Sequence, residues 1–129
     1  MTWIDDRLAQ WTRKKENDRA IADCAEAIFN ELWDEVKQFV HEANSKGFQL
    51  TTNGSPHQRV IQCRGEVLRI TLNRDAEVIS VEAPTFNFTL SFAVGNDGVV
   101  GLKCNEKRVS LFQAARLVLD PFLFPDLQE

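Results

Sequence analysis

Two histidines and three cysteines are the side chains of this chain best suited to nucleophilic or acid–base chemistry. A nucleophile needs a base within hydrogen-bond reach. His57 is predicted to begin a strand that carries Arg59 on the same face, but the six residues from His57 to Cys63 span roughly 20 Å of strand, too far for a dyad. His57 and Arg59 form a candidate polar site. An enzyme that used them with a nearby acid would need His57 to lie in a cleft.

The spacing also gives little support to metal or phosphate binding. No pair of Cys or His is separated by two to four residues, as zinc ligands usually are. His41 stands beside Glu42 near the end of a predicted helix, where a cation favours the negative helix terminus. The segment 95–98 joins two predicted strands and precedes no helix, so it indicates a hairpin turn and not a phosphate loop. We expect no metal, no cofactor and no catalytic residue.

The composition is that of one globular domain. The 129 residues are 43% hydrophobic, and 15 Lys and Arg stand against 19 Asp and Glu, for a formal net charge of -4. This acidic balance argues against binding to nucleic acid, and the one basic run, 13–15, is followed at once by Glu16. Three widely spaced cysteines indicate a reducing compartment, and no segment has the length and apolar character of a membrane span or signal peptide. We expect one cytoplasmic domain over residues 1–129 that binds neither nucleic acid nor membrane.

A helical pattern covers the first 46 residues. Apolar residues recur at steps of three and four from Ile21 to Val40, which predicts an amphipathic helix with one buried face. The helix is predicted to end at Ser45-Lys46-Gly47, because glycine can take the left-handed cap conformation.

The N-terminal continuation of this pattern leaves two alternatives open. Its apolar residues are Trp3, Ile4, Leu8 and Trp11. Polar Lys15 and Asp18 then interrupt the stripe before it rejoins the long helix. In one alternative, a single helix of about forty residues carries the apolar end beyond the domain, where another chain would have to cover it. In the other, Asn17 or Asp18 caps a new helix, and residues 1–17 fold back onto the core.

A period of two indicates strands in the central part of the chain. Six strands are predicted, at 48–52, 57–63, 67–73, 78–83, 86–94 and 99–104. The turn sequences between them are too short for crossover helices, so neighbouring strands should pair antiparallel in a meander. Apolar and polar residues alternate along the strands. We therefore expect one face of the sheet to be covered by the long helix and the other face to be polar.

The chain is predicted to close with a short second helix. Ser110 and Gln113 stand at capping-box spacing ahead of an apolar segment from Ala114 to Leu119, and Pro121 is predicted to end the helix. The expected fold is therefore α+β: a long N-terminal amphipathic helix packed on a five- to six-stranded antiparallel meander sheet, with a short C-terminal helix. This order of elements resembles that of helix-grip ligand binders and bacterial secretion chaperones. No residue motif accompanies the resemblance, so it implies no function.

Two functions of different classes follow from these features. The first is a non-enzymatic protein-interaction module that self-associates as a homodimer or binds another protein, since tryptophan is over-represented at binding hot spots. Its interface candidates are Trp3, Ile4, Leu8 and Trp11. The alternative is a carrier of a small apolar ligand held between the sheet and the long helix. Its pocket would be lined by Phe86, Phe88, Phe92, Leu32, Val36 and Phe39.

Overall fold

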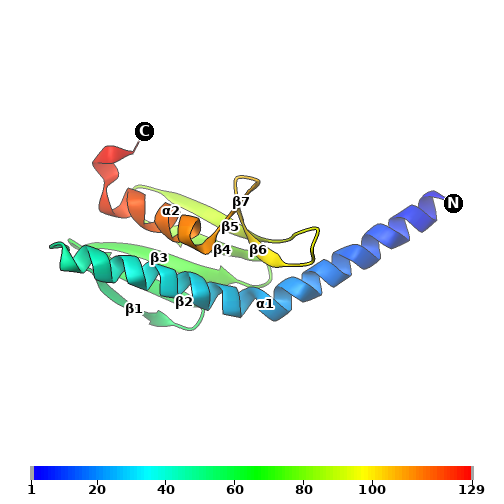
Figure 1. The fold of residues 1–129 in the computed structure, drawn as a ribbon, viewed down its shortest axis with the longest axis horizontal. Helices are drawn as coiled ribbons and strands as arrows, with labels where there is room; N and C mark the ends of the chain where they lie inside the picture. The colour runs from blue at the N-terminus through cyan, green and yellow to red at the C-terminus, as the bar shows by residue number, and fades with distance from the viewer. Residues whose placement is uncertain (1, 129) are drawn as a thin grey trace.

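The computed structural model describes residues 2–128 and has two helices on one face of a seven-stranded sheet (Figure 1). Helix α1 spans Trp3–Ser45, α2 spans Leu111–Leu123, and a short 3-10 helix follows at Pro125–Leu127. The strands are β1 Thr51–Ser55, β2 Gln58–Cys63, β3 Glu66–Asn73, β4 Val78–Glu82, β5 Asn87–Val94, β6 Val100–Cys104 and β7 Lys107–Val109. This is the predicted α+β fold, with seven strands in place of five or six.

The strands form the predicted antiparallel meander, in the order β1-β2-β3-β4-β5-β6-β7. The seventh strand is absent from the prediction because its turn does not have the usual sequence. Asn105 and Glu106, which join β6 to β7, both have positive φ, as a type I′ turn requires. Glycine usually occupies the second of these positions, and Glu106 stands there instead. A three-residue strand behind an unusual turn gives almost no periodic signal.

The start of the sheet also differs from the prediction. Strand β1 lies three residues later than expected, and the turn that follows it is Pro56-His57 rather than 53–56. Gly54 is therefore a strand residue, with a φ of 137°, and a Cβ there would collide with the backbone carbonyl of Gln58. Glycine is needed at this position for close approach of two backbones, although its neighbours have the composition of a turn.

The core lies between the helices and one face of the sheet. The buried residues of α1 are Ile21, Ala25, Phe29, Leu32, Trp33, Val36 and Val40. The buried residues of the strands are Ile61, Cys63, Leu68, Ile70, Leu72, Ile79, Val81, Leu90, Phe92 and Leu102. Polar residues that alternate with these, such as Gln62, Arg69 and Thr89, are exposed on the opposite face. One covered face and one polar face is the arrangement that the alternation predicts.

Helix α2 begins at the predicted capping box, where Ser110 and Gln113 exchange hydrogen bonds. The prediction that Pro121 ends this helix is wrong, since α2 continues to Leu123. The last turn buries Phe122 and Leu123. Burying two such side chains stabilises the fold by about 3–6 kcal/mol, enough to offset the cost of about 3 kcal/mol for a proline inside a helix.

The N-terminal segment forms part of a single long helix, which is the first of the two predicted alternatives. Helix α1 is continuous through Asn17 and Asp18, and a capping box of Thr2 and Asp5 starts it. Residues 2–16 are all exposed. Figure 1 shows this part of α1 projecting away from the sheet. We call residues 3–16 the projecting part of α1.

Leucine replacements in the two parts of α1 should have very different effects on stability. Leu32→Ala should lower the free energy of unfolding by about 2–5 kcal/mol, since Leu32 is fully buried and its loss leaves a cavity. Leu8→Ala should change it by less than about 0.5 kcal/mol, because the Leu8 side chain is exposed. Urea denaturation of dilute protein measures both values, and similar losses would show that the projecting part belongs to the core.

Glu106→Gly should stabilise the β6–β7 hairpin. A left-handed conformation costs an ordinary residue about 1–2 kcal/mol, and glycine avoids most of that cost. We expect the free energy of unfolding to rise by about 0.5–1 kcal/mol, as measured by urea denaturation. Glu66→Gly, at the start of β3, is the matched control and should destabilise, since glycine weakens a strand. Equal destabilisation by both substitutions would contradict the role of the turn.

Candidate functional site

The four interface candidates lie on one face of the projecting part of α1. The exposed fractions of Trp3, Ile4, Leu8 and Trp11 are 74%, 52%, 53% and 56%. Ile4, Leu8 and Trp11 follow one another at steps of four and three residues, and Trp3 directly precedes Ile4, so the four side chains lie on one broad side of the helix. The two indole rings alone present on the order of 300 Å² to solvent, which is as much as the largest apolar patch on many monomeric proteins. We call these four residues the N-terminal stripe.

The charges around the stripe are divided along the helix. Asp5 and Asp6 lie in its first turn, beside Trp3 and Ile4. Basic residues 13–15 lie toward the domain, and Lys15 places its Nζ 3.9 Å from the centre of the Trp11 ring. The outer end of the stripe is therefore acidic, and its inner end is basic.

Polar contacts hold α1 to the sheet where the projecting part begins. Arg74, in the turn between β3 and β4, donates a hydrogen bond of 3.4 Å to the carbonyl oxygen of Ala22. Glu77, in the same turn, interacts with Asp18, which also pairs with Lys14 at 2.8 Å. Burial, together with hydrogen bonding and repulsion from Asp18, raises the pKa of Glu77 above its ordinary value. The hydrogen bond from Lys14 lowers the pKa of Asp18.

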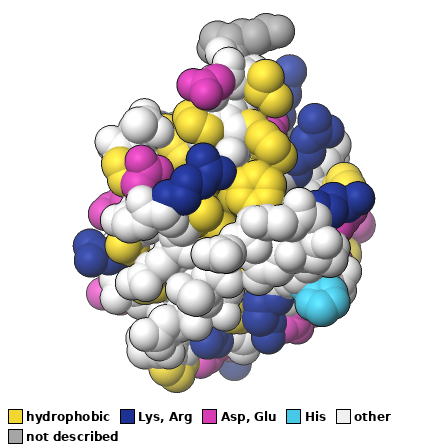
Figure 2. Space-filling view, turned by 90° about the vertical axis from the view of Figure 1, so that its left-hand side faces the viewer, with side chains coloured by type: hydrophobic (Ala, Val, Ile, Leu, Met, Phe, Trp, Pro, Cys, Tyr) yellow, Lys and Arg dark blue, Asp and Glu magenta, His cyan; other side chains and the backbone are white. Residues whose placement is uncertain are grey.

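A second apolar surface lies at the opposite end of α1, in a groove between α1 and α2. Figure 2 looks onto this end of the molecule and shows hydrophobic side chains gathered between Lys and Arg side chains. The groove has a volume of about 440 Å³, within the usual range of binding pockets. Its apolar lining is Phe39, Ala43, Phe48, Phe112, Leu119, Leu123 and Phe124, and its charged lining is Glu42, Lys46, Arg116 and Asp120. We call it the α1–α2 groove.

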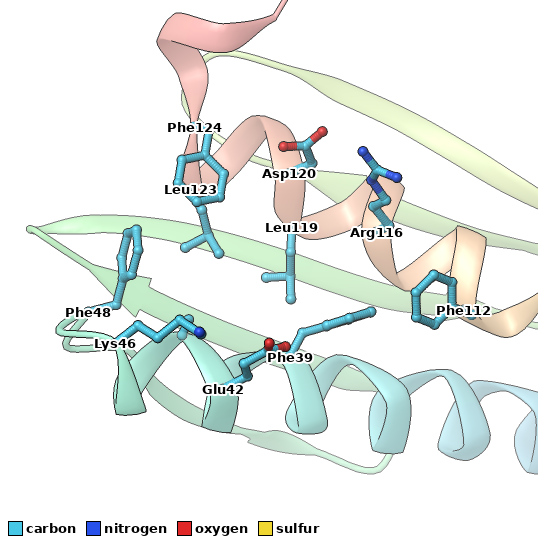
Figure 3. Close-up of a pocket in the computed structure, with 11 residues that line it drawn as sticks. Phe39, Glu42, Lys46, Phe48, Phe112, Arg116, Leu119, Asp120, Leu123 and Phe124 are labelled. Atoms are coloured by element: carbon cyan, nitrogen blue, oxygen red, sulfur yellow. The ribbon is translucent and has the colours of Figure 1, made fainter.

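The side chains of the groove have distinct orientations (Figure 3). Leu119 and Leu123 point from α2 into the space between the helices, while Arg116 and Asp120 point away from it. Two aromatic pairs flank the leucines. Phe39 packs edge-on against Phe112 with ring centres 5.2 Å apart, and Phe48 packs against Phe124 at 5.7 Å. The groove is therefore apolar inside and charged at its rim.

Phe112 and Phe124 are the least covered of these aromatic residues. Their side chains are 57% and 41% exposed, whereas Leu119 and Leu123 are buried. Arg64 adds a further cation near the groove, with its Cζ 5.4 Å from the centre of the Phe48 ring. This surface combines large apolar groups with cationic neighbours.

The six residues predicted to line an apolar pocket are divided between the core and its margin. Leu32, Val36 and Phe92 are buried in the core between α1 and the sheet. Phe86 and Phe88 are partly buried and stack with ring centres 6.2 Å apart. Phe39 belongs to the α1–α2 groove.

His57 and Arg59 both contact the middle of α1. His57 lies in the turn between β1 and β2, half exposed, with its Nε2 3.5 Å from Oε1 of Glu26. Arg59 donates a hydrogen bond of 3.3 Å to Oδ1 of Asn30, and its Cζ is 5.7 Å from the centre of the Trp33 ring. These contacts join the edge of the sheet to the helix, and His57 stands on an open turn.

Within residues 2–128, no cluster of three or more His, Cys, Asp or Glu side chains could hold a metal ion. No helix of this described part of the chain is both long and apolar enough to cross a membrane. Comparison with protein-family models, curated proteins and solved structures finds no match. The two apolar surfaces therefore have to be interpreted from their own geometry.

Sequence reasoning missed the α1–α2 groove. Its lining comes from the end of α1, the following loop and α2, which are far apart in the chain. One signal was available. Phe112 and Phe124 are large apolar residues at the two ends of the α2 segment, outside the buried set Ala114, Ala115, Val118, Leu119, Phe122 and Leu123. Apolar residues that leave the buried face of a helix indicate a second contact surface.

Glu77→Gln should stabilise the protein at neutral pH and lose that advantage in acid. Because the pKa of Glu77 is raised on folding, its carboxyl group favours the folded state when protonated, and this contribution is lost as pH rises through the folded pKa. At neutral pH the charged carboxylate therefore disfavours folding, and glutamine removes that cost. Urea denaturation across acid and neutral pH should show the variant and the native protein converging below the ordinary carboxyl pKa of 4.5. A difference that does not change with pH would contradict the assignment.

Proposed function

We propose that the protein is a non-enzymatic interaction module that self-associates through the N-terminal stripe. The exposure of Trp3, Ile4, Leu8 and Trp11 on a helix that projects from the domain is the observation that carries this proposal. Large apolar side chains in water are unfavourable, and burying each of them between two chains contributes about 1.5–3 kcal/mol. Two tryptophans in one patch are also typical of the residues that dominate binding energy.

The continuity of α1 adds support. Within the stripe, Ile4, Leu8 and Trp11 follow the same three- and four-residue spacing as the buried face of the helix from Ile21 to Val40. It is an apolar helix face of the kind that covers a core, and it extends past the sheet that this chain provides. A second chain is the simplest partner that would bury this exposed apolar face.

The alternative function, a carrier of a small apolar ligand held between the sheet and α1, has less support. Leu32, Val36 and Phe92 pack in the core there. The α1–α2 groove lies elsewhere, and its open rim with two exposed phenylalanines is better suited to a protein surface than to an enclosed ligand. Self-association is therefore the preferred interpretation.

Replacing the stripe should reduce the solution mass from that of an oligomer to that of a single chain of 14.7 kDa. The variant is Trp3→Ser/Leu8→Ser/Trp11→Ser, measured by light scattering beside the native protein over a range of concentrations. The control is Ala9→Ser/Arg13→Ser/Glu16→Ser, which changes the same number of exposed residues on the opposite face of the helix and should leave the mass unchanged.

Circular dichroism should show that both variants stay folded, because all of the substituted side chains are exposed. A native protein that is monomeric at every concentration, or a stripe variant with the native mass, would refute self-association through the stripe.

A further inference from the structure

The stripe cannot pack against the groove of its own chain. Both lie on α1, one near Trp3 and the other near Phe39–Lys46, at opposite ends of a single helix (Figure 1). A 43-residue helix is roughly 65 Å long and cannot fold back on itself. Whatever covers the stripe belongs to another molecule.

Pairing of two stripes with each other would be a weak arrangement. The seam that begins at Ile4, Leu8 and Trp11 continues with Lys15 and Asp18, so only three apolar positions would meet their counterparts. Three paired apolar positions are few for a two-helix contact, since coiled coils usually sustain their apolar seam over about three to four heptads. Each tryptophan would also remain open on the side away from the partner helix.

The α1–α2 groove offers a more complete cover. A helix laid between two other helices is contacted on both sides, and such grooves bind amphipathic helices through anchors at steps of three and four residues. Ile4, Leu8 and Trp11 have that spacing. Leu119 and Leu123 form the floor of the groove, and the exposed rings of Phe112 and Phe124 stand at its two ends.

The charges of the two surfaces are complementary. Asp5 lies beside the outer end of the stripe, and the rim of the groove carries Lys46 and Arg116, with Arg64 close by. The two acidic residues of the rim, Glu42 and Asp120, have a counterpart in Arg7, which lies three residues after Ile4 on the same side of the helix. Opposite charges across an interface favour correct pairing over other arrangements.

Resting on the proposed self-association, we infer that the α1–α2 groove binds the N-terminal stripe of a second copy of this chain. The contact is heterologous, because it joins two different patches. If two copies exchange their projecting helices, the assembly closes as a dimer. If they do not, each copy binds the next one and the assembly grows into a chain of molecules. Trp3 and Trp11 would become buried in both cases.

Mixing two complementary defective variants tests this inference. The stripe variant is Trp3→Ser/Leu8→Ser/Trp11→Ser, and the groove variant is Phe112→Glu/Phe124→Ser. Both phenylalanines are exposed, and Phe112 is the second residue of α2, where a carboxylate stabilises the helix start. Each variant alone should be a monomer, and an equimolar mixture should form a 1:1 complex of twice that mass. The control, Leu117→Ser/Leu127→Ser, changes exposed leucines outside the groove and should leave self-association unchanged.

The outcomes separate the inference from the proposed function. A groove variant that self-associates like the native protein would overturn the inference and leave stripe-to-stripe pairing. A stripe variant that self-associates like the native protein would overturn both. If both variants are folded monomers and form no complex when mixed, the inference is also overturned, because an intact stripe and an intact groove are then present in one solution and do not bind.

Tryptophan fluorescence gives a second readout on the same samples. The groove variant keeps Trp3 and Trp11, and its emission should shift to the blue when the stripe variant is added, since both rings leave water. A synthetic peptide of residues 2–17 should compete with this shift. If the apolar dye ANS reverses the blue shift and the peptide does not, the groove is a site for small apolar ligands and the inference is overturned.

Discussion

The packing of one face of α1 against the sheet is the contact on which the rest of the structure depends. An antiparallel meander with one apolar face is not stable with that face in water, and α1 covers it with a row of buried residues from Ile21 to Val40. Phe29, Leu32 and Val36 have almost no exposed surface. This one layer of contacts fixes the helix on the sheet and sets where every other element has to lie.

A helix of 43 residues is longer than the sheet it covers. The excess forms the projecting part at the N-terminal end, where the apolar pattern continues without anything to pack against. At the other end, α2 lies beside α1 on the same sheet face, and the space between the two helices becomes the α1–α2 groove (Figures 1 and 3). The two candidate binding surfaces are thus both consequences of how one long helix sits on a shorter sheet.

The polar residues closest to a catalytic pattern have structural contacts. His57 lies against Glu26, and Arg59 lies against Asn30 and Trp33. Arg74, which was not a candidate, contacts the backbone of Ala22 in a similar way. All of these pairs join the sheet to α1 along its length. They are partly exposed and contribute modestly to stability, but together they orient the helix whose face the core requires.

The sequence by itself determined the class of fold and the polar and apolar faces of the sheet. It also determined the helical pattern of the first 46 residues, the end of α1 near Ser45, and the apolar character of Trp3, Ile4, Leu8 and Trp11. These features depend on periodicity and capping, which are local. The sequence did not reveal β7, because Glu106 replaces the glycine of a usual turn, or the true place of β1, because Gly54 serves a backbone contact with another strand. Only the tertiary structure decided that α1 is unbroken at Asn17 and Asp18, and only it brought Phe39, Phe48, Phe112 and Phe124 together. A groove between elements that are distant in the chain is set by how those elements pack, and no local pattern encodes that packing.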